Sequence, residues 1–435
     1  MKPLGDQLTK FSFDDKMVLT KFSFDDKLVK MKSRSLSKPI QDLALNRKKM
    51  AFISGPRQCG KTTLAKSLLV DRELYFNWDD HRFKAIWTKS PELIAERAFA
   101  QTKPRLVLDE FHKNRRWKTQ VKAFYDHHGD NLEIILTGSA HLNAYRKGVD
   151  SLMGRFVHFH LLPFSLGELE TKAPLAFEEF NSSILAGSWP ESSRSSKSLV
   201  DSLWKFGGFP EPLLSQSEQV HNIWSRNRLE LLVRQDLRDL SRILDLSQVE
   251  VLASLLPVRV GSPLSVQSLR EDLDCAHTTL TRWLKGLSEV YYHFELKPYS
   301  THVIRSLKKE GKIYLYDWSA IEDMGSRFEN MVACHLLKIC HYFKDIGESD
   351  LKLHYLRDKE KREVDFLVMA KNKPLFSVES KLNQLNLDRA YLQFQKRLKV
   401  PHFQIVKTPN ICRRISEGPC PAYVVSFDRF FQQLP

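Results

Sequence analysis

The 435-residue chain lacks any apolar run near the ~20 residues needed to span a bilayer, so a membrane-spanning protein is excluded. Its first residues also lack the apolar segment of a signal peptide. Cysteine is scarce: the six residues are scattered and form no set with zinc-ligand spacing, which excludes a disulfide scaffold. We therefore expect a cytoplasmic protein with reduced thiols and no membrane partner.

Acidic residues are in deficit, because 52 Asp and Glu stand against 67 Lys and Arg, for a formal net charge of +15. This balance indicates a polyanionic partner, such as nucleic acid, nucleotide phosphates or an anionic surface. Residues 1–150 carry 29 basic and 18 acidic side chains, residues 151–350 carry 22 and 26, and residues 351–435 carry 16 and 8. The C-terminal part is therefore the predicted contact for nucleic acid.

The first 35 residues contain a tandem duplication. Leu8–Lys16 reads LTKFSFDDK, and Leu19–Lys27 repeats it. Two copies are too few for a stacked repeat protein, which needs at least three. We expect residues 1–35 to be an extension that is poorly ordered or partly helical, and its sequence does not indicate a role.

Short apolar segments alternate with helical patterns in residues 36–190. The predicted strands are Met50–Ser54, Leu74–Asn77, Arg105–Leu108 and Leu132–Leu136. Strands that alternate with helices pair in parallel, so we predict an α/β domain over residues 36–190.

A phosphate-binding motif follows the first of these strands. Residues 55–62 read GPRQCGKT, which matches G-x-x-x-x-G-K-[ST] in full. Such a loop wraps phosphates with backbone N–H groups, while its lysine contacts the β- and γ-phosphates and its hydroxyl binds Mg²⁺. The predicted ATP-binding residues are Gly55, Pro56, Arg57, Gln58, Cys59, Gly60, Lys61, Thr62 and Thr63.

Two acids end the strand Leu106–Leu108. We predict that Asp109 holds Mg²⁺ together with Thr62, and that Glu110 activates the attacking water as a general base. The next strand ends in Thr137 and Ser139, and either residue is placed to contact the γ-phosphate or the water. An α/β context favours these roles over a pair of solvent-facing acids and a plain turn.

The chain resembles the predicted prokaryotic AAA+-type ATPases that carry a C-terminal domain of unknown function. The resemblance runs from about Ser35 to Thr408, and its motifs are ISGPRQCGKTTL, RLVLDEFHK, EIILTGSA, LMGRF, LLPFSLGEL, FGGFPEPLL, KIYLYD, GSRFENMVA, EVDFLV and VESK. It implies ATP binding and hydrolysis, a helical, winged-helix-like middle and a nuclease-like end. It implies neither a substrate nor an oligomeric state.

Arg155 stands where this family keeps a Gly-Arg pair. An arginine there acts on the γ-phosphate in trans as a finger, acts in cis as a sensor, or forms a structural salt bridge.

The middle of the chain, residues 191–305, shows a helix-turn-helix spacing. Val266–Leu273 and His277–Leu287 are the two predicted helices, and Tyr291–Pro298 is the predicted wing. Polar residues on the second helix can contact DNA, but residues 251–300 carry equal numbers of basic and acidic side chains. Contact with a protein partner is therefore the stronger alternative for this segment.

The C-terminal part, residues 306–435, contains acids at the spacing of restriction-endonuclease-like folds. Asp365 and Glu379 lie on consecutive predicted strands, Lys381 follows Glu379 by two residues, and Glu329 lies in the preceding helix. Such acids bind Mg²⁺, which polarises a phosphodiester, while the lysine orients water. We predict a second metal site here, and a degenerate domain with surface salt bridges is the alternative.

These patterns predict an Mg²⁺-dependent ATPase that couples hydrolysis to rearrangement on a nucleic-acid or protein partner. Two alternatives stay open. One is an ATP-gated, metal-dependent nuclease, and the other is a nucleotide switch that binds a partner without hydrolysis.

Overall fold

A computed structural model of the protein describes residues 32–138, 152–238, 245–300, 310–388, 391–416 and 420–435. The duplicated segment and Ser139 lie outside the described residues. Residues 33–435 form one compact unit. No helix in the described part of the chain combines the length and the apolar character that a membrane span requires.

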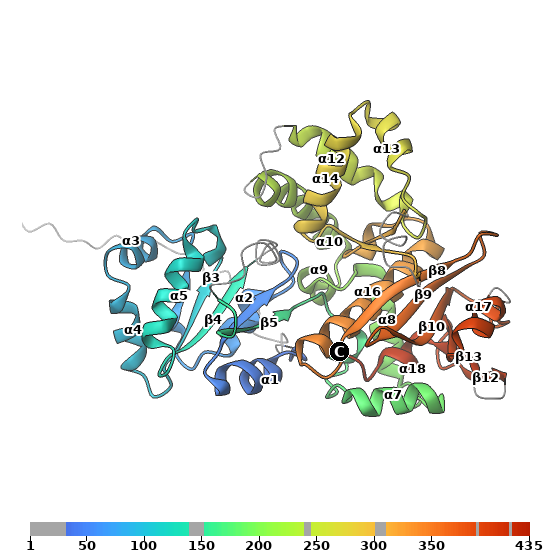
Figure 1. Cartoon of the computed structure of the whole chain (residues 1–435), viewed down its shortest axis with the longest axis horizontal. Helices are drawn as coiled ribbons and strands as arrows, with labels where there is room; N and C mark the ends of the chain where they lie inside the picture. The colour runs from blue at the N-terminus through green and yellow to red at the C-terminus, as the bar shows by residue number, and fades with distance from the viewer. Residues whose placement is uncertain (1–31, 139–151, 239–244, 301–309, 389–390, 417–419) are drawn as a thin grey trace, which may run out of the picture. The chain divides into compact units, whose positions relative to one another are not determined.

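The N-terminal half contains a five-stranded sheet in which every pair of neighbours is parallel, which confirms the predicted α/β class (Figure 1). Its order is β2-β3-β4-β1-β5, so β4 lies between the strand before the loop and the strand that ends in the acids. The strands are β1 (Met50–Ser54), β2 (Tyr75–Asn77), β3 (Arg105–Asp109), β4 (Glu133–Gly138) and β5 (Phe156–His160).

The strands of this sheet are buried on both faces, as expected for a parallel sheet. Along β1, Met50 and Phe52 pack into one apolar cluster, whereas Ala51 and Ile53 pack into another. Alternation of side chains along a strand produces this division. The helices of this half are α1 (Ser37–Pro39), α2 (Lys61–Ser67), α3 (His81–Lys89), α4 (Glu92–Phe99) and α5 (Trp117–His128).

The middle of the chain is helical, and the helices expected at residues 266–273 and 277–287 are present as α13 and α14. The buried apolar side chains of these two helices are Leu269, Leu273, Leu280, Trp283, Leu284 and Leu287. The wing segment contains β6 (His293–Leu296), which pairs antiparallel with β7 (Lys312–Leu315). Two helices, α6 (Leu166–Leu169) and α7 (Phe177–Ala186), end the first segment. The helices of the middle are α8 (Arg194–Phe206), α9 (Pro210–Ser215), α10 (Glu218–Leu231), the π-helical turn η7 (Leu232–Leu237), α12 (Leu246–Leu255), α13 (Val266–Leu273) and α14 (His277–Glu289).

The C-terminal part is a six-stranded mixed sheet of order β12-β13-β11-β10-β9-β8, and α16 packs against its strands β8 and β10 (Figure 1). The strands are β8 (Leu351–Arg357), β9 (Glu363–Ala370), β10 (Lys373–Lys381), β11 (His402–Val406), β12 (Cys412–Ser416) and β13 (Ala422–Ser426). The helices are α16 (Met324–Asp345), α17 (Tyr391–Leu398) and α18 (Phe427–Phe431).

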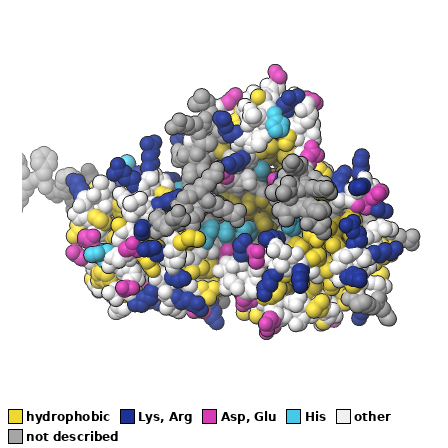
Figure 2. All heavy atoms as spheres, in the orientation of Figure 1, with side chains coloured by type: hydrophobic (Ala, Val, Ile, Leu, Met, Phe, Trp, Pro, Cys, Tyr) yellow, Lys and Arg dark blue, Asp and Glu magenta, His cyan; other side chains and the backbone are white. Residues whose placement is uncertain are grey.

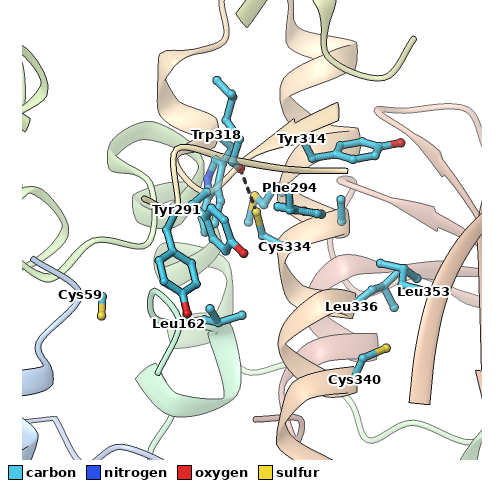
Figure 3. Packing of buried hydrophobic residues seen from close by; sticks show 14 of the residues in the cluster. Cys59, Leu162, Tyr291, Phe294, Tyr314, Trp318, Cys334, Leu336, Cys340 and Leu353 are labelled. Carbon is cyan, nitrogen blue, oxygen red and sulfur yellow. Dashed lines mark hydrogen bonds between the residues drawn. The ribbon is translucent and has the colours of Figure 1, made fainter. Parts of the chain in front are cut away.

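One buried apolar cluster continues from the first sheet through the middle helices into α16. Figure 3 shows side chains of Leu162, Tyr291 and Trp318 gathered beside Cys334 of α16. The three predicted segments of the chain therefore share a core, although the five-stranded and six-stranded sheets belong to different segments.

Candidate functional site

The phosphate-binding loop connects β1 to α2, and two of its glycines have backbone angles that favour glycine. Gly55 has φ +155° and Gly60 has φ +97°. A Cβ atom at Gly55 would lie 2.0 Å from the carbonyl oxygen of Leu161, so no side chain fits there. The loop is therefore shaped by close backbone packing against the segment that follows β5.

Lys61 is buried and turns back into the loop. Its Nζ donates hydrogen bonds to the carbonyl oxygens of Gly55, at 3.0 Å, and Pro56, at 2.7 Å. The side chain of Cys59 points the other way, since its Sγ donates to the carbonyl oxygen of Leu161 at 3.2 Å. Thr63 is exposed. The ammonium group of Lys61 therefore lies inside the loop, where the phosphates of a nucleotide would bind.

Asp109, at the end of β3, collects three hydroxyl groups from three different elements. Thr62 Oγ1 and Tyr75 Oη donate to its Oδ2 at 2.8 and 2.6 Å, and Thr137 Oγ1 donates to its Oδ1. Asp109 is buried, and proximity to its carboxylate adds to burial in raising the pKa of Tyr75. Thr62 and Asp109 are thus brought together as predicted, and Thr137 contacts Asp109.

The hydroxyl of Thr62 and the carboxylate of Asp109 fit a magnesium ion. Both offer the hard oxygen ligands that Mg²⁺ prefers, and both lie beside the loop that would hold phosphates. Their 2.8 Å contact means that one ion can engage both groups, directly or through water.

Glu110 follows directly and has a left-handed backbone, with φ +53°. Its Oε2 lies 3.7 Å from Lys113 Nζ and 3.7 Å from His112 Nε2. Burial raises the pKa of Glu110, while the charges of Lys61 and Lys113 act in the opposite direction. A carboxylate with a raised pKa beside the loop lysine has the properties of a general base.

Two residues that the sequence patterns did not identify complete the site. One is Tyr75, and the other is Asp236 in η7. Arg57 of the loop donates from Nη1 to Asp236 Oδ1 at 2.6 Å and from Nη2 to Gln235 Oε1 at 3.1 Å. Burial raises the pKa of Asp236, and Arg57 and Lys61 oppose that rise. No motif marks Asp236, which is 179 residues from Arg57.

Arg155 lies at the opposite end of the sheet from the loop. It precedes β5, whose first residue pairs with the first residue of β1, whereas the loop follows the last residue of β1. Its Nε donates to Asp126 Oδ1 at 2.5 Å. Within one chain the structure brings Arg155 together with Asp126 and not with Lys61, which matches the salt-bridge alternative and leaves action in trans as a prediction.

The predicted acids of the C-terminal part converge on the strands β9 and β10. The backbone N–H of Asp365 donates to Glu379 Oε2 at 3.3 Å, and Lys381 Nζ lies 2.9 Å from Glu379 Oε1. Lys312 Nζ lies 3.4 Å from Glu329 Oε1 and 3.9 Å from Asp365 Oδ1. All four predicted residues therefore belong to one cluster.

This cluster contains two further charged groups, Lys312 and Glu363, which form a salt bridge. Burial and the nearby Asp365 raise the pKa of Glu329 to about 7, and the same causes raise the pKa of Glu379. Glu363 is two residues before Asp365 on β9, so period-two alternation puts both on one face and could have identified it. Crowded carboxylates with raised pKa values fit a divalent cation.

Three families match successive parts of the chain. Residues 47–170 match the family described as an AAA domain, residues 197–324 match a domain of unknown function (DUF8612), and residues 324–419 match another (DUF4143). With its loop, its acid-bearing strand β3 and the intervening strand β4, the first region has the P-loop fold of AAA+-type ATPases. This is a nucleotide-binding fold.

The chain is also similar to proteins that have no assigned function. An uncharacterized protein of Methanocaldococcus jannaschii is 26% identical over 369 residues, covering 81% of this chain and 79% of the relative. An uncharacterized protein of Mycobacterium tuberculosis is 23% identical over 277 residues, covering 63% of this chain and 55% of the relative.

Two solved structures align with this chain at low similarity. The Aeropyrum pernix ORC1 protein in complex with DNA has a TM-score of 0.31 and 12% identity, covering 68% of this chain and 90% of that chain. AMPPCP-bound DnaA from Aquifex aeolicus has a TM-score of 0.29 and 13% identity, covering 59% and 86%.

Proposed function

We propose that the protein is an Mg²⁺-dependent ATPase that uses hydrolysis to rearrange the parts packed against its phosphate-binding loop. The observation that carries this proposal is the convergence of Thr62, Tyr75 and Thr137 on Asp109. Three elements and the end of β3 supply these four groups, and they meet beside Lys61 and Glu110. Such a set suits phosphoryl transfer to water.

Each residue has a separate task in this proposal. The loop N–H groups and Lys61 bind the phosphates, so Lys61 leaves the carbonyl oxygens of Gly55 and Pro56 when ATP enters. Thr62 and Asp109 hold Mg²⁺, which when bound neutralises developing charge on the phosphates. Tyr75 and Thr137 position Asp109. Glu110 accepts a proton from the attacking water.

Contacts with the middle of the chain start at the loop and at the strand end before it. Arg57 is paired with Asp236 of η7, and Tyr291 donates from its Oη to Ser54 Oγ, at 3.2 Å, at the end of β1. Phosphates entering the loop change the charge beside both contacts. We infer that this is how the nucleotide state reaches the middle of the chain.

The test compares two variants that remove different steps. Lys61→Ala should lose ATP binding, because the phosphates lose their cation, and Glu110→Gln should bind ATP but lose turnover by 100-fold or more (~10²–10⁴ for a general base). Binding is measured with a fluorescent ATP analogue and turnover by phosphate release. Glu96→Gln, an exposed change on α4, is the control. Normal turnover in Glu110→Gln would refute its role.

The acidic cluster supports a second candidate activity, cleavage of a phosphodiester. Asp365, Glu379 and Glu329 would hold a divalent cation, which supplies an activated water and a polarised phosphate when bound. Lys381 and Lys312 are the cations placed to stabilise negative charge at the same point. Their clustering around raised-pKa carboxylates is what favours this activity over surface salt bridges.

A plasmid assay tests this second activity. Wild-type protein with Mg²⁺ or Mn²⁺, with and without ATP, should convert supercoiled DNA, whereas Asp365→Ala should not. Glu360→Ala is the matched control, because Glu360 is exposed in the turn before β9. Intact plasmid under every nucleotide condition would exclude a nuclease acting on double-stranded DNA.

For the partner, we propose nucleic acid at the basic C-terminal part, or a protein at α13 and α14. Figure 2 shows that the Lys and Arg side chains on one face of the molecule are dispersed among acidic and apolar side chains and do not form one continuous patch. ATPase rates with and without single- and double-stranded DNA distinguish the two. An ATPase rate that DNA leaves unchanged favours the protein partner. A protein that binds ATP but shows no turnover favours the alternative of a nucleotide switch without hydrolysis.

A further inference from the structure

A second group of ligand-type side chains lies where the edge strand β5 meets α16. It consists of His160, the last residue of β5, and of His341 and Asp345 on α16. His341 and Asp345 are four residues apart, so they lie on one face of the helix. None of these residues takes part in the nucleotide site or in the acidic cluster of β9 and β10.

The geometry of this group is compact. One ligand atom from each residue lies within 4.8 Å of the others. The rings of His160 and His341 have centroids 4.3 Å apart. The Asp345 carboxylate is held in place by the backbone N–H of His160, at 2.6 Å from Oδ2, and by His160 Nδ1, at 2.9 Å from Oδ1.

We propose that His160, His341 and Asp345 bind a Zn²⁺ ion. Two imidazoles and one carboxylate are a ligand set that zinc takes in proteins, with a fourth position left for water. Bonds of about 2.0–2.2 Å in a tetrahedron separate ligand atoms by roughly 3.4 Å. The ligand atoms of this group lie within 4.8 Å of one another, and His160 Nδ1 lies 2.9 Å from Asp345 Oδ1, so binding the ion needs side-chain shifts of only about 1 Å. The His160 side chain is 16% exposed and that of Asp345 is 4% exposed, so the ion would enter past His160.

Such an ion would join the first sheet to the C-terminal part immediately behind the phosphate-binding loop. His160 pairs in register with Ser54, the residue before Gly55. The neighbouring His158 contacts Ser54 Oγ through Nε2 at 2.7 Å, and its ring centroid is 4.2 Å from that of His160. The zinc ion would therefore act as a clamp between β5 and α16.

The experiment measures zinc retained by the full-length protein. The chain is loaded with ZnCl₂, dialysed against metal-free buffer that contains Mg²⁺ to fill carboxylate sites, and analysed by mass spectrometry of the metal. Wild type should retain about one Zn²⁺ per chain, and His341→Asn and Asp345→Asn should lose at least 90% of it. Zinc should also raise the melting temperature of wild type but not that of the variants.

The control is His127→Asn, which changes the exposed group Glu92, His127 and His128 and should leave retention unchanged. If the α16 variants do not fold, Co²⁺ bound to wild type replaces them, and it should give the intense visible bands of a tetrahedral site that Zn²⁺ abolishes. Wild type without retained zinc, His341→Asn with full retention, or Co²⁺ without these bands would each overturn the proposal. None of these readouts depends on ATP turnover.

Discussion

At the scale of single residues, His293 in β6 gives the protein a sensitivity to acid. It is buried, and neither ring nitrogen has a hydrogen-bond partner among the described residues. Burial lowers the pKa of His293 to about 4. The unfolded chain, with a histidine pKa near 6.5, binds this proton first as the pH falls. The free energy of unfolding should therefore decrease between about pH 6.5 and pH 4.

The substitution His293→Leu tests this contribution. Leucine binds no proton, so the unfolded chain no longer takes up one more proton than the folded protein at this position. The decrease in the free energy of unfolding with falling pH should therefore become shallower by up to ~1.4 kcal/mol per pH unit in that window. Urea denaturation of both proteins at pH 7, 6 and 5 measures the slopes. Equal slopes would show that the folded protein takes up the proton at this position as readily as the unfolded chain.

The residues that sequence reasoning could identify are those that belong to local patterns. Lys61 and Thr62 stand inside one eight-residue motif, and Asp109 and Glu110 end an apolar strand. Tyr75 could not be identified, because its contact with Asp109 depends on β2 lying beside β3 in the sheet. Asp236 could not be identified either, since an aspartate in a helical stretch is normally solvent-exposed.

At the scale of elements, the contact between the loop and η7 should affect nucleotide affinity. Asp236 lies beside the loop with 9% of its side chain exposed, and its Oδ2 has no hydrogen-bond partner among the described residues. A carboxylate there repels incoming phosphates, so Asp236→Asn should tighten ATP binding. For an assumed separation of about 6 Å, removing a unit charge is worth about 0.7 kcal/mol at the dielectric constant of water, so Kd should fall by about threefold or more.

Calorimetric titration with ATP and Mg²⁺ measures this change, and Glu230→Gln, an exposed change on the preceding helix, is the control. Weaker binding by Asp236→Asn would reverse the interpretation. It would show that Asp236 holds Arg57, and with it the loop, in the form that accepts phosphates.

Elements themselves could be predicted where their pattern is strong. The helices α13 and α14 coincide with the predicted segments, and the parallel sheet follows from strands that alternate with helices. The C-terminal acids could be placed because β9 and β10 form a hairpin. In its register Phe366 pairs with Val378, which brings the preceding Asp365 next to Glu379. The contact between Arg57 and η7 could not be predicted in this way, because no turn or hairpin connects the two segments.

At the scale of the whole molecule, the shared core should make the described chain unfold as one unit. On α16, Leu336, Ile339 and Phe343 are buried in the cluster that also contains Phe159 and Leu161. Glu168 pairs with Lys338 of the same helix, and both side chains are buried. Separating residues 36–190, 191–305 and 306–435 would expose these surfaces.

Denaturation by urea should therefore show one transition, with coincident curves from far-UV circular dichroism and tryptophan fluorescence. A truncated chain that ends at residue 305 should aggregate, because it loses α16 and β7. ATP with Mg²⁺ should shift the single transition of the full chain upward. Two separated transitions, of which ATP moves only one, would show that the predicted segments are independent domains.

The sequence by itself determined the phosphate-binding loop, the strand that ends in Asp109, the α/β class and the acids of the C-terminal sheet, because each depends on spacing along the chain. Tertiary structure decided which distant groups meet: Asp236 with Arg57, Lys312 with Glu329, and His160 with His341 and Asp345. Those meetings follow from how the sheets and helices pack around a common core. Packing brings together residues that are far apart in sequence, so no local sequence pattern can predict these contacts.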